Sequence, residues 1–96
     1  MRKGKINSLW LKNYIRDRGG RMYVTTRITI GGWWTAYYAP SGLMEKPKDT
    51  YEYEEFIIDD VKLFIEKKTF EEYIRKNELL ISVEGYGRYW LYIDEE

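Results

Sequence analysis

The 96-residue chain contains no cysteine and no histidine. This double absence removes the thiolate nucleophile, the imidazole base and the two softest metal ligands together. The chain has aromatic side chains instead, with ten Tyr, four Trp and three Phe. We therefore expect a domain without thiol or imidazole chemistry, and we expect neither a cofactor nor a metal site.

The length of the chain indicates one domain, residues 1–96, that buries roughly two thirds of the surface exposed when it is unfolded. No apolar run approaches the ~18 residues of a membrane-spanning helix, and the basic N-terminus lacks the apolar region of a signal peptide. We expect a cytoplasmic protein with no membrane partner and an acidic tail, 94–96, that frays. Abundant Glu and Lys with few amides is a composition typical of thermophiles.

Two helices are predicted, each before a strand-rich stretch. Asn7 or Ser8 is a suitable N-cap for a helix through Arg18, and the glycines at 19–20 end it. Thr69 is the expected N-cap of a short second helix over residues 70–76.

Runs rich in β-branched and aromatic residues predict the strands. These runs cover residues 22–30, 56–58, 61–65, 79–83 and 89–93. Residues 59–60 and 84–87 are predicted hairpin turns, 33–39 extended chain or loop, and 40–49 a turn-rich stretch. The expected fold is α+β. It comprises a mainly antiparallel sheet or flattened barrel, an N-terminal helix and a short helix before the last hairpin.

Several local strings occur in an order that matches a known family. They are Tyr14-Ile15, Gly19-Gly20, Tyr23-Val24-Thr25, Gly31-Gly32, Pro40, Lys46-Pro47-Lys48, Tyr51, Ile58-Asp59-Asp60-Val61 and Leu80-Ile81-Ser82-Val83. Their order and spacing resemble the HesB-like fold of iron–sulfur biogenesis proteins, and in particular the small CC/Se motif family.

One position departs from that family. Where the family has paired cysteines or selenocysteine, this chain has Trp33-Trp34. Thiolates hold iron–sulfur clusters, whereas an indole donates one N–H and ligates nothing. The resemblance therefore implies the family's scaffold without its thiol or cluster chemistry.

The densest aromatic stretch follows the second glycine pair. It carries Trp33, Trp34, Tyr37 and Tyr38. Side chains alternate between the two faces of an extended chain, so these four cannot all point into one core. We expect them to form a binding face, or to fill a second small core or a dimer interface.

The first functional hypothesis is a non-catalytic protein-interaction or self-association module, with a protein partner or a second copy in a homodimer. An enzyme is not expected, because no histidine is present to activate a serine and no phosphate-binding loop occurs.

The alternative hypothesis is a nucleic-acid-binding domain. It would use a local group of arginines, Arg16, Arg18, Arg21 and Arg27, beside the exposed aromatics. The sixteen basic and sixteen acidic residues argue against a generally basic nucleic-acid binder. Residues 84–92 are similar to the RNA-stacking strand of an RRM domain, but Glu84 stands where that strand has a basic residue.

Overall fold

A computed structural model describes residues 2–30, 35–48 and 51–94. Strands and helices follow one another along these residues. They are β1 (Arg2–Ile6), α1 (Leu9–Asp17), β2 (Arg21–Ile30), β3 (Ala36–Leu43), β4 (Tyr53–Ile58), β5 (Val61–Glu66), α2 (Lys67–Tyr73), β6 (Glu78–Val83) and β7 (Gly87–Ile93).

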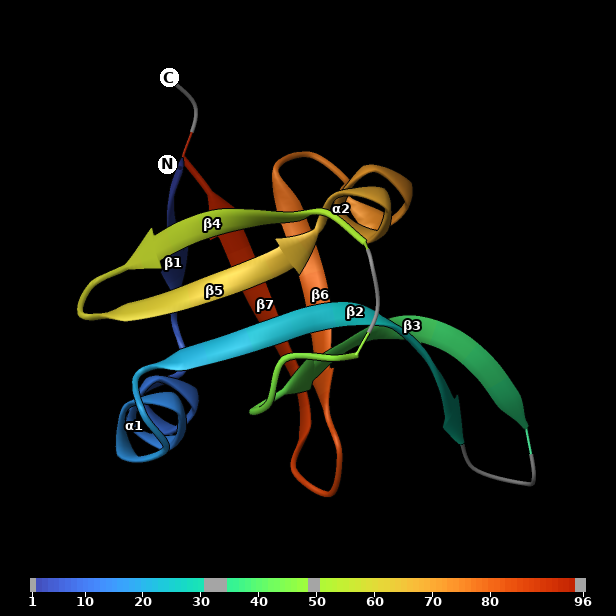
Figure 1. Ribbon diagram of the computed structural model, residues 1–96, viewed down its shortest axis with the longest axis horizontal. Helices are drawn as coiled ribbons and strands as arrows, with labels where there is room; N and C mark the ends of the chain where they lie inside the picture. Colours follow the sequence, from blue (N-terminus) through green and yellow to red (C-terminus); the bar gives the residue numbers. More distant parts are fainter. Residues whose placement is uncertain (1, 31–34, 49–50, 95–96) are drawn as a thin grey trace.

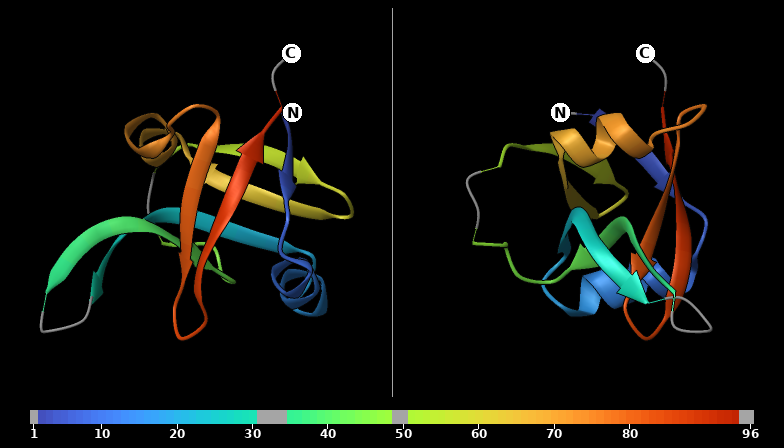
Figure 2. Two further views of the ribbon diagram at one scale, coloured as in Figure 1. Left: turned by 180° about the vertical axis from the view of Figure 1, so that it is seen from behind. Right: turned by 90° about the vertical axis from the view of Figure 1, so that its right-hand side faces the viewer.

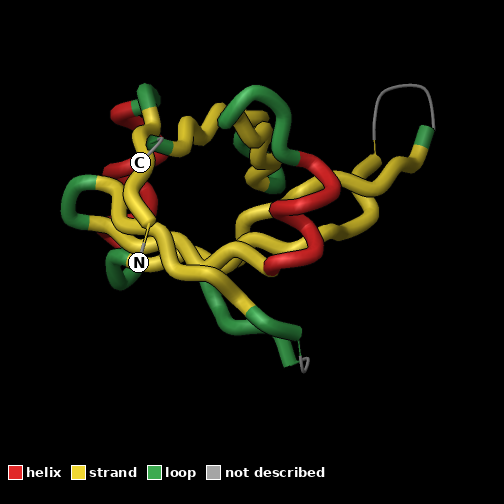
Figure 3. The backbone as a smooth tube through the Cα atoms, turned by 90° about the horizontal axis from the view of Figure 1, so that it is seen from above, coloured by secondary structure: helices red, strands yellow, loops and turns green. Residues whose placement is uncertain are grey.

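The strands close into a barrel in the order β1-β4-β5-β2-β3-β6-β7, with β7 next to β1 (Figures 1 and 3). Neighbours are antiparallel at β2–β3, β4–β5, β6–β7 and β1–β7. They are parallel at β1–β4, β2–β5 and β3–β6. The α+β expectation is confirmed, but the sheet is mixed rather than mainly antiparallel. The three parallel pairs join strands that are distant in sequence, so no local turn signal announces them.

The barrel interior is filled by apolar side chains from every strand except β3, joined by two from α1. They are Ile6, Leu11, Ile15, Met22, Val24, Phe56, Ile58, Val61, Leu63, Ile65, Leu79, Ile81, Val83, Leu91 and Ile93. Figure 2 shows the two helices at opposite ends of the barrel. Helix α1 covers one end with Leu11 and Ile15, and Phe70 of α2 stacks on Phe56 with ring centroids 5.3 Å apart.

The ends of α1 agree with the sequence prediction. The Ser8 hydroxyl accepts a hydrogen bond from the Leu11 amide at 3.1 Å, as an N-cap does. After the helix, Gly19 and Gly20 have φ of 105° and 78°, a region in which a side chain is strained. The chain can therefore leave the helix and enter β2 at once.

Three predictions about elements are wrong. The strand β1 precedes α1, so the chain does not begin with the helix. Pro40 belongs to β3 and not to a turn, because its position is paired with Thr26 of β2. Thr69 is not an N-cap: α2 starts two residues earlier, and the Thr69 side chain is buried and bonded to Glu66.

Gly4 tests whether β1 truly completes the barrel. A Cβ at Gly4 would lie 2.8 Å from the carbonyl oxygen of Tyr92 in β7, a backbone atom that cannot move without disturbing the ladder. Gly4→Ala should lower the free energy of unfolding by about 1–3 kcal/mol, as overpacking does. Chemical denaturation measures this change. The exposed neighbour supplies the control, since Lys5→Ala should stay within about 0.5 kcal/mol of wild type. Equal stability of both variants would contradict the close contact of β1 with β7.

Candidate binding surface

The outer half of the β2–β3 hairpin projects beyond the barrel wall. Strand β2 pairs with β5 only from Arg21 to Val24. Its pairing with β3 continues for six more residues, to Ile30 opposite Ala36. Strand β3 in turn touches β6 through one bridge, Ser41 with Ser82. The result is a two-stranded arm, residues 26–30 with 36–40, which extends away from the barrel in Figures 1 and 2.

The hydrogen bonds at the base of the arm fix where its backbone groups point. The Thr26 amide donates to the Thr69 hydroxyl at 3.0 Å, away from β3. Antiparallel pairs alternate between those that exchange hydrogen bonds and those that do not. Because Thr26 faces outward, so do the N–H and C=O of Ile28, two residues on. None of the described residues pairs with Ile28 on that outer edge.

The Ile28–Tyr38 pair presents apolar surface on one face of the arm. The two residues stand directly opposite each other, and their side chains are 62% and 65% exposed. In a pair that exchanges no backbone hydrogen bonds, the side chains are especially close. The Tyr38 carbonyl faces outward as well and accepts a 3.4 Å hydrogen bond from the Tyr73 hydroxyl. The face is therefore apolar, although it continues the side of β2 that is buried inside the barrel.

The opposite face of the arm carries Tyr37, half-buried beside Arg88. The Arg88 guanidinium lies 5.2 Å from the centre of the Tyr37 ring, a cation–π contact. The expectation that the aromatic side chains would lie on both faces is thus met at positions 37 and 38. Trp33 and Trp34 lie outside the described residues.

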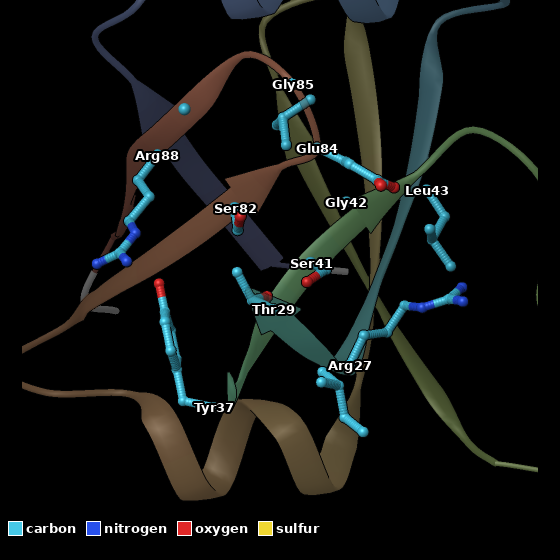
Figure 4. A pocket seen from close by; sticks show the side chains of 13 residues that line it. Arg27, Thr29, Tyr37, Ser41, Gly42, Leu43, Ser82, Glu84, Gly85 and Arg88 are labelled. Atoms are coloured by element: carbon cyan, nitrogen blue, oxygen red, sulfur yellow. The ribbon is translucent and has the colours of Figure 1, made fainter. Parts of the chain in front are cut away.

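A groove runs along the outside of the β3–β6 seam. Its volume is about 590 Å³, and Arg27, Tyr37, Ser41, Ser82 and Arg88 are among the residues that line it. Figure 4 shows the two arginines on opposite sides of the groove, with the Ser41 and Ser82 side chains between them. Two cations and several hydroxyl groups make this a polar groove suited to an elongated, partly anionic ligand.

The structure does not gather the four predicted arginines into one patch. The Arg16 guanidinium holds the Asp60 carboxylate with two hydrogen bonds of 2.6 and 2.8 Å. Arg18 lies over the ring of Tyr14, 3.6 Å from its centre. Both are committed to contacts within the domain.

The other two arginines lie on β2, six residues apart. At about 3.3 Å per residue, Arg21 and Arg27 are roughly 20 Å from each other along the strand. Arg27 contributes to the groove, whereas Arg21 lies at the α1 end of the barrel.

The sequence analysis did not identify an aromatic cluster at the α1 end. Trp10 packs against three tyrosines, with ring centroids 5.0 Å from Tyr14, 5.0 Å from Tyr86 and 5.4 Å from Tyr89. The i,i+4 spacing of Trp10 and Tyr14 was the available signal for half of it. The rings are in contact with one another, so the cluster fastens α1 to the β6–β7 turn and leaves no cage for a ligand.

No trio of carboxylates that could hold a metal ion occurs among residues 2–30, 35–48 and 51–94. Within the same residues, neither helix has the length and apolar character to cross a bilayer.

The Arg16–Asp60 pair has a measurable signature. The hydrogen bond from Arg16 lowers the pKa of the Asp60 carboxyl, and the positive charges of Arg16 and Lys12 act in the same direction. Since the folded-state pKa is the lower one, this carboxylate stabilises the fold above its unfolded pKa. That contribution is lost as the pH falls through the folded value. Arg16→Gln should raise the pKa of Asp60, as followed by NMR titration of its carboxyl carbon.

Lys12→Gln is the matched control for this titration, because it removes a more distant charge and leaves the hydrogen bond in place. It should raise the Asp60 pKa by less than Arg16→Gln does. Equal shifts in the two variants would show that the bidentate contact is not formed in solution.

Comparison with known proteins gives one match. The model of the CC/Se motif containing family matches residues 10–94, which include every element from α1 to β7 except the first residue of α1. No curated protein and no solved structure matches the chain. The match covers most of the sequence, and the chain belongs to the CC/Se motif family.

Proposed function

We propose that this chain is a non-catalytic protein-interaction domain that self-associates through the outer edge of its β2–β3 arm. The observation that carries the proposal is the Ile28–Tyr38 pair, which is largely exposed on a strand whose outward backbone groups no described residue pairs with. A strand edge of this kind binds a further strand by backbone hydrogen bonds, and apolar side chains beside it add affinity.

A second copy of the chain is a suitable occupant of this edge. In an antiparallel pairing of two β2 strands centred on Ile28, the two isoleucines stand together. Arg27 then faces Thr29 of the second copy, so no like charges are opposed. A two-fold dimer results, which is the commonest symmetry of small oligomers. Trp33 and Trp34 follow directly after β2 in the sequence, and we include them in the proposed interface.

The family name supports the non-catalytic part of the proposal. The name refers to a CC/Se motif, yet this chain contains no cysteine. We infer that the chain keeps a HesB-like scaffold with Trp33-Trp34 at the ligand positions. Without thiolates the scaffold retains binding surfaces rather than thiol or cluster chemistry.

A charge on the arm edge tests self-association. Ile28→Lys should shift the protein from dimer to monomer in sedimentation equilibrium, because a lysine on a strand edge blocks further pairing. The circular dichroism spectrum should not change, since the side chain lies outside the core. The control is Leu9→Lys on α1, whose side chain is equally exposed, at 65%, but lies away from the arm. A wild-type protein that remains monomeric, or an Ile28→Lys variant that still dimerises, would contradict the proposal.

Nucleic-acid binding is the second candidate, and the groove in Figure 4 is the observation that favours it. Arg27 and Arg88 flank this groove, and Tyr37 offers a ring against which a base can stack. Arg16 and Arg18, by contrast, are engaged with Asp60 and Tyr14.

Fluorescence anisotropy with a labelled single strand tests this candidate. Affinity should fall as salt is added, and Arg27→Ala should reduce the salt slope by about one. Arg16→Ala is the control and should leave the slope unchanged. Binding that ignores salt would exclude an interaction through arginine and phosphate.

A further inference from the structure

Glu66 is a buried carboxylate at the base of the arm. Its side chain is only 5% exposed, and its Oε1 atom accepts a 2.5 Å hydrogen bond from the Thr69 hydroxyl. Because Thr69 uses its one proton there, the Thr26 hydroxyl must donate to Thr69, at 2.8 Å. The Thr26 amide donates to the same oxygen. This chain of donors orients the Glu66 carboxylate and satisfies one of its two oxygens.

The second oxygen, Oε2, has no partner among the described residues. Every fully buried polar side-chain atom of those residues is hydrogen-bonded, so Oε2 must reach open space. The space beside it is a cavity of about 350 Å³ that Glu66 lines. A buried carboxylate strongly favours a cationic partner.

The neighbouring lysines do not supply that partner. The Lys67 ammonium lies 3.3 Å from Glu52, and the Lys68 ammonium lies 4.0 Å from Glu72. Lys68 and Glu72 also line the cavity, and their opposite charges leave it with the net negative charge of Glu66.

Three tyrosines complete the cavity. Tyr38, Tyr51 and Tyr73 line it together with Glu66. The face of an aromatic ring attracts a cation, and clustered rings around an acidic group are a recognised way to hold an amine. A volume of this size lies at the lower end of the range of small-ligand sites, about 300–1,000 Å³.

We propose that this cavity binds an alkylammonium group. The ammonium donates a hydrogen bond to Glu66 Oε2, and the alkyl chain lies against the tyrosine rings. The group can belong to a free amine or to a lysine side chain of another protein. The site is separate from the outer edge of β2, so it does not depend on the self-association proposed above.

Butylammonium is the probe, and it is titrated into the Ile28→Lys protein while amide chemical shifts are followed by NMR. Use of this monomeric variant, or of wild type if that is monomeric, keeps the result independent of dimerisation. Butanol, the neutral analogue, should bind at least tenfold more weakly. Glu66→Gln keeps the shape and the contact with Thr69 but removes the charge, and it should weaken binding at least tenfold. Glu72→Gln is the matched control, since it lines the same cavity but is paired with Lys68, and it should change affinity by less than about twofold.

Tyr38 gives a second test that does not disturb the buried network. Tyr38→Leu should weaken butylammonium binding by about two- to fivefold, whereas Tyr38→Phe should preserve it, because the attraction comes from the ring. Spermidine and a Gly-Lys-Gly peptide then distinguish a free amine from a protein lysine by which binds more tightly. Absence of butylammonium binding, or equal binding by Glu66→Gln and Glu72→Gln, would overturn the proposal.

Discussion

The structure depends on a mismatch in strand length. Strand β2 has ten residues, but the chain of β5 turns into α2 directly after Glu66, so the β2–β5 ladder ends at Val24. Thr69 in the first turns of α2 fills the next outward position by accepting from the Thr26 amide. Beyond Thr26 no strand among the described residues continues the barrel wall on that side. The arm, its free edge and the exposed Ile28–Tyr38 pair all follow from this early end of the ladder.

The same junction links the two proposals. Thr69 joins the backbone of β2 to the buried carboxylate of Glu66, and Tyr73 of the same helix contacts the Tyr38 carbonyl on the arm. Helix α2 therefore both sets where the arm leaves the barrel and forms one wall of the amine cavity. Occupancy of the cavity would rigidify the base of the arm without closing its outer edge, since Ile28 does not line the cavity.

Local signals in the sequence predicted what is local in the fold. The Ser8 cap, the glycines after α1, and the β4–β5 and β6–β7 hairpins are each defined by a few adjacent residues, and they are where the sequence places them. Strand β1 and the parallel pairs were not predictable, because their partners lie far along the chain. Alternation correctly separated Tyr37 from Tyr38. It also marked Ile28 as a residue of the buried face, and only the end of the ladder explains its exposure. The burial of Glu66 arises from long-range packing against Thr26, which no spacing reveals.

Amide hydrogen exchange along β2 tests the central claim, that Ile28 presents an unpaired backbone edge. In dilute, monomeric protein the Ile28 amide should exchange rapidly, because it points away from β3. The amides of Arg27 and Thr29, which face β3, should be protected. At concentrations where the protein associates, the Ile28 amide should become protected as well. An Ile28 amide as protected as its two neighbours in the dilute monomer would contradict the account.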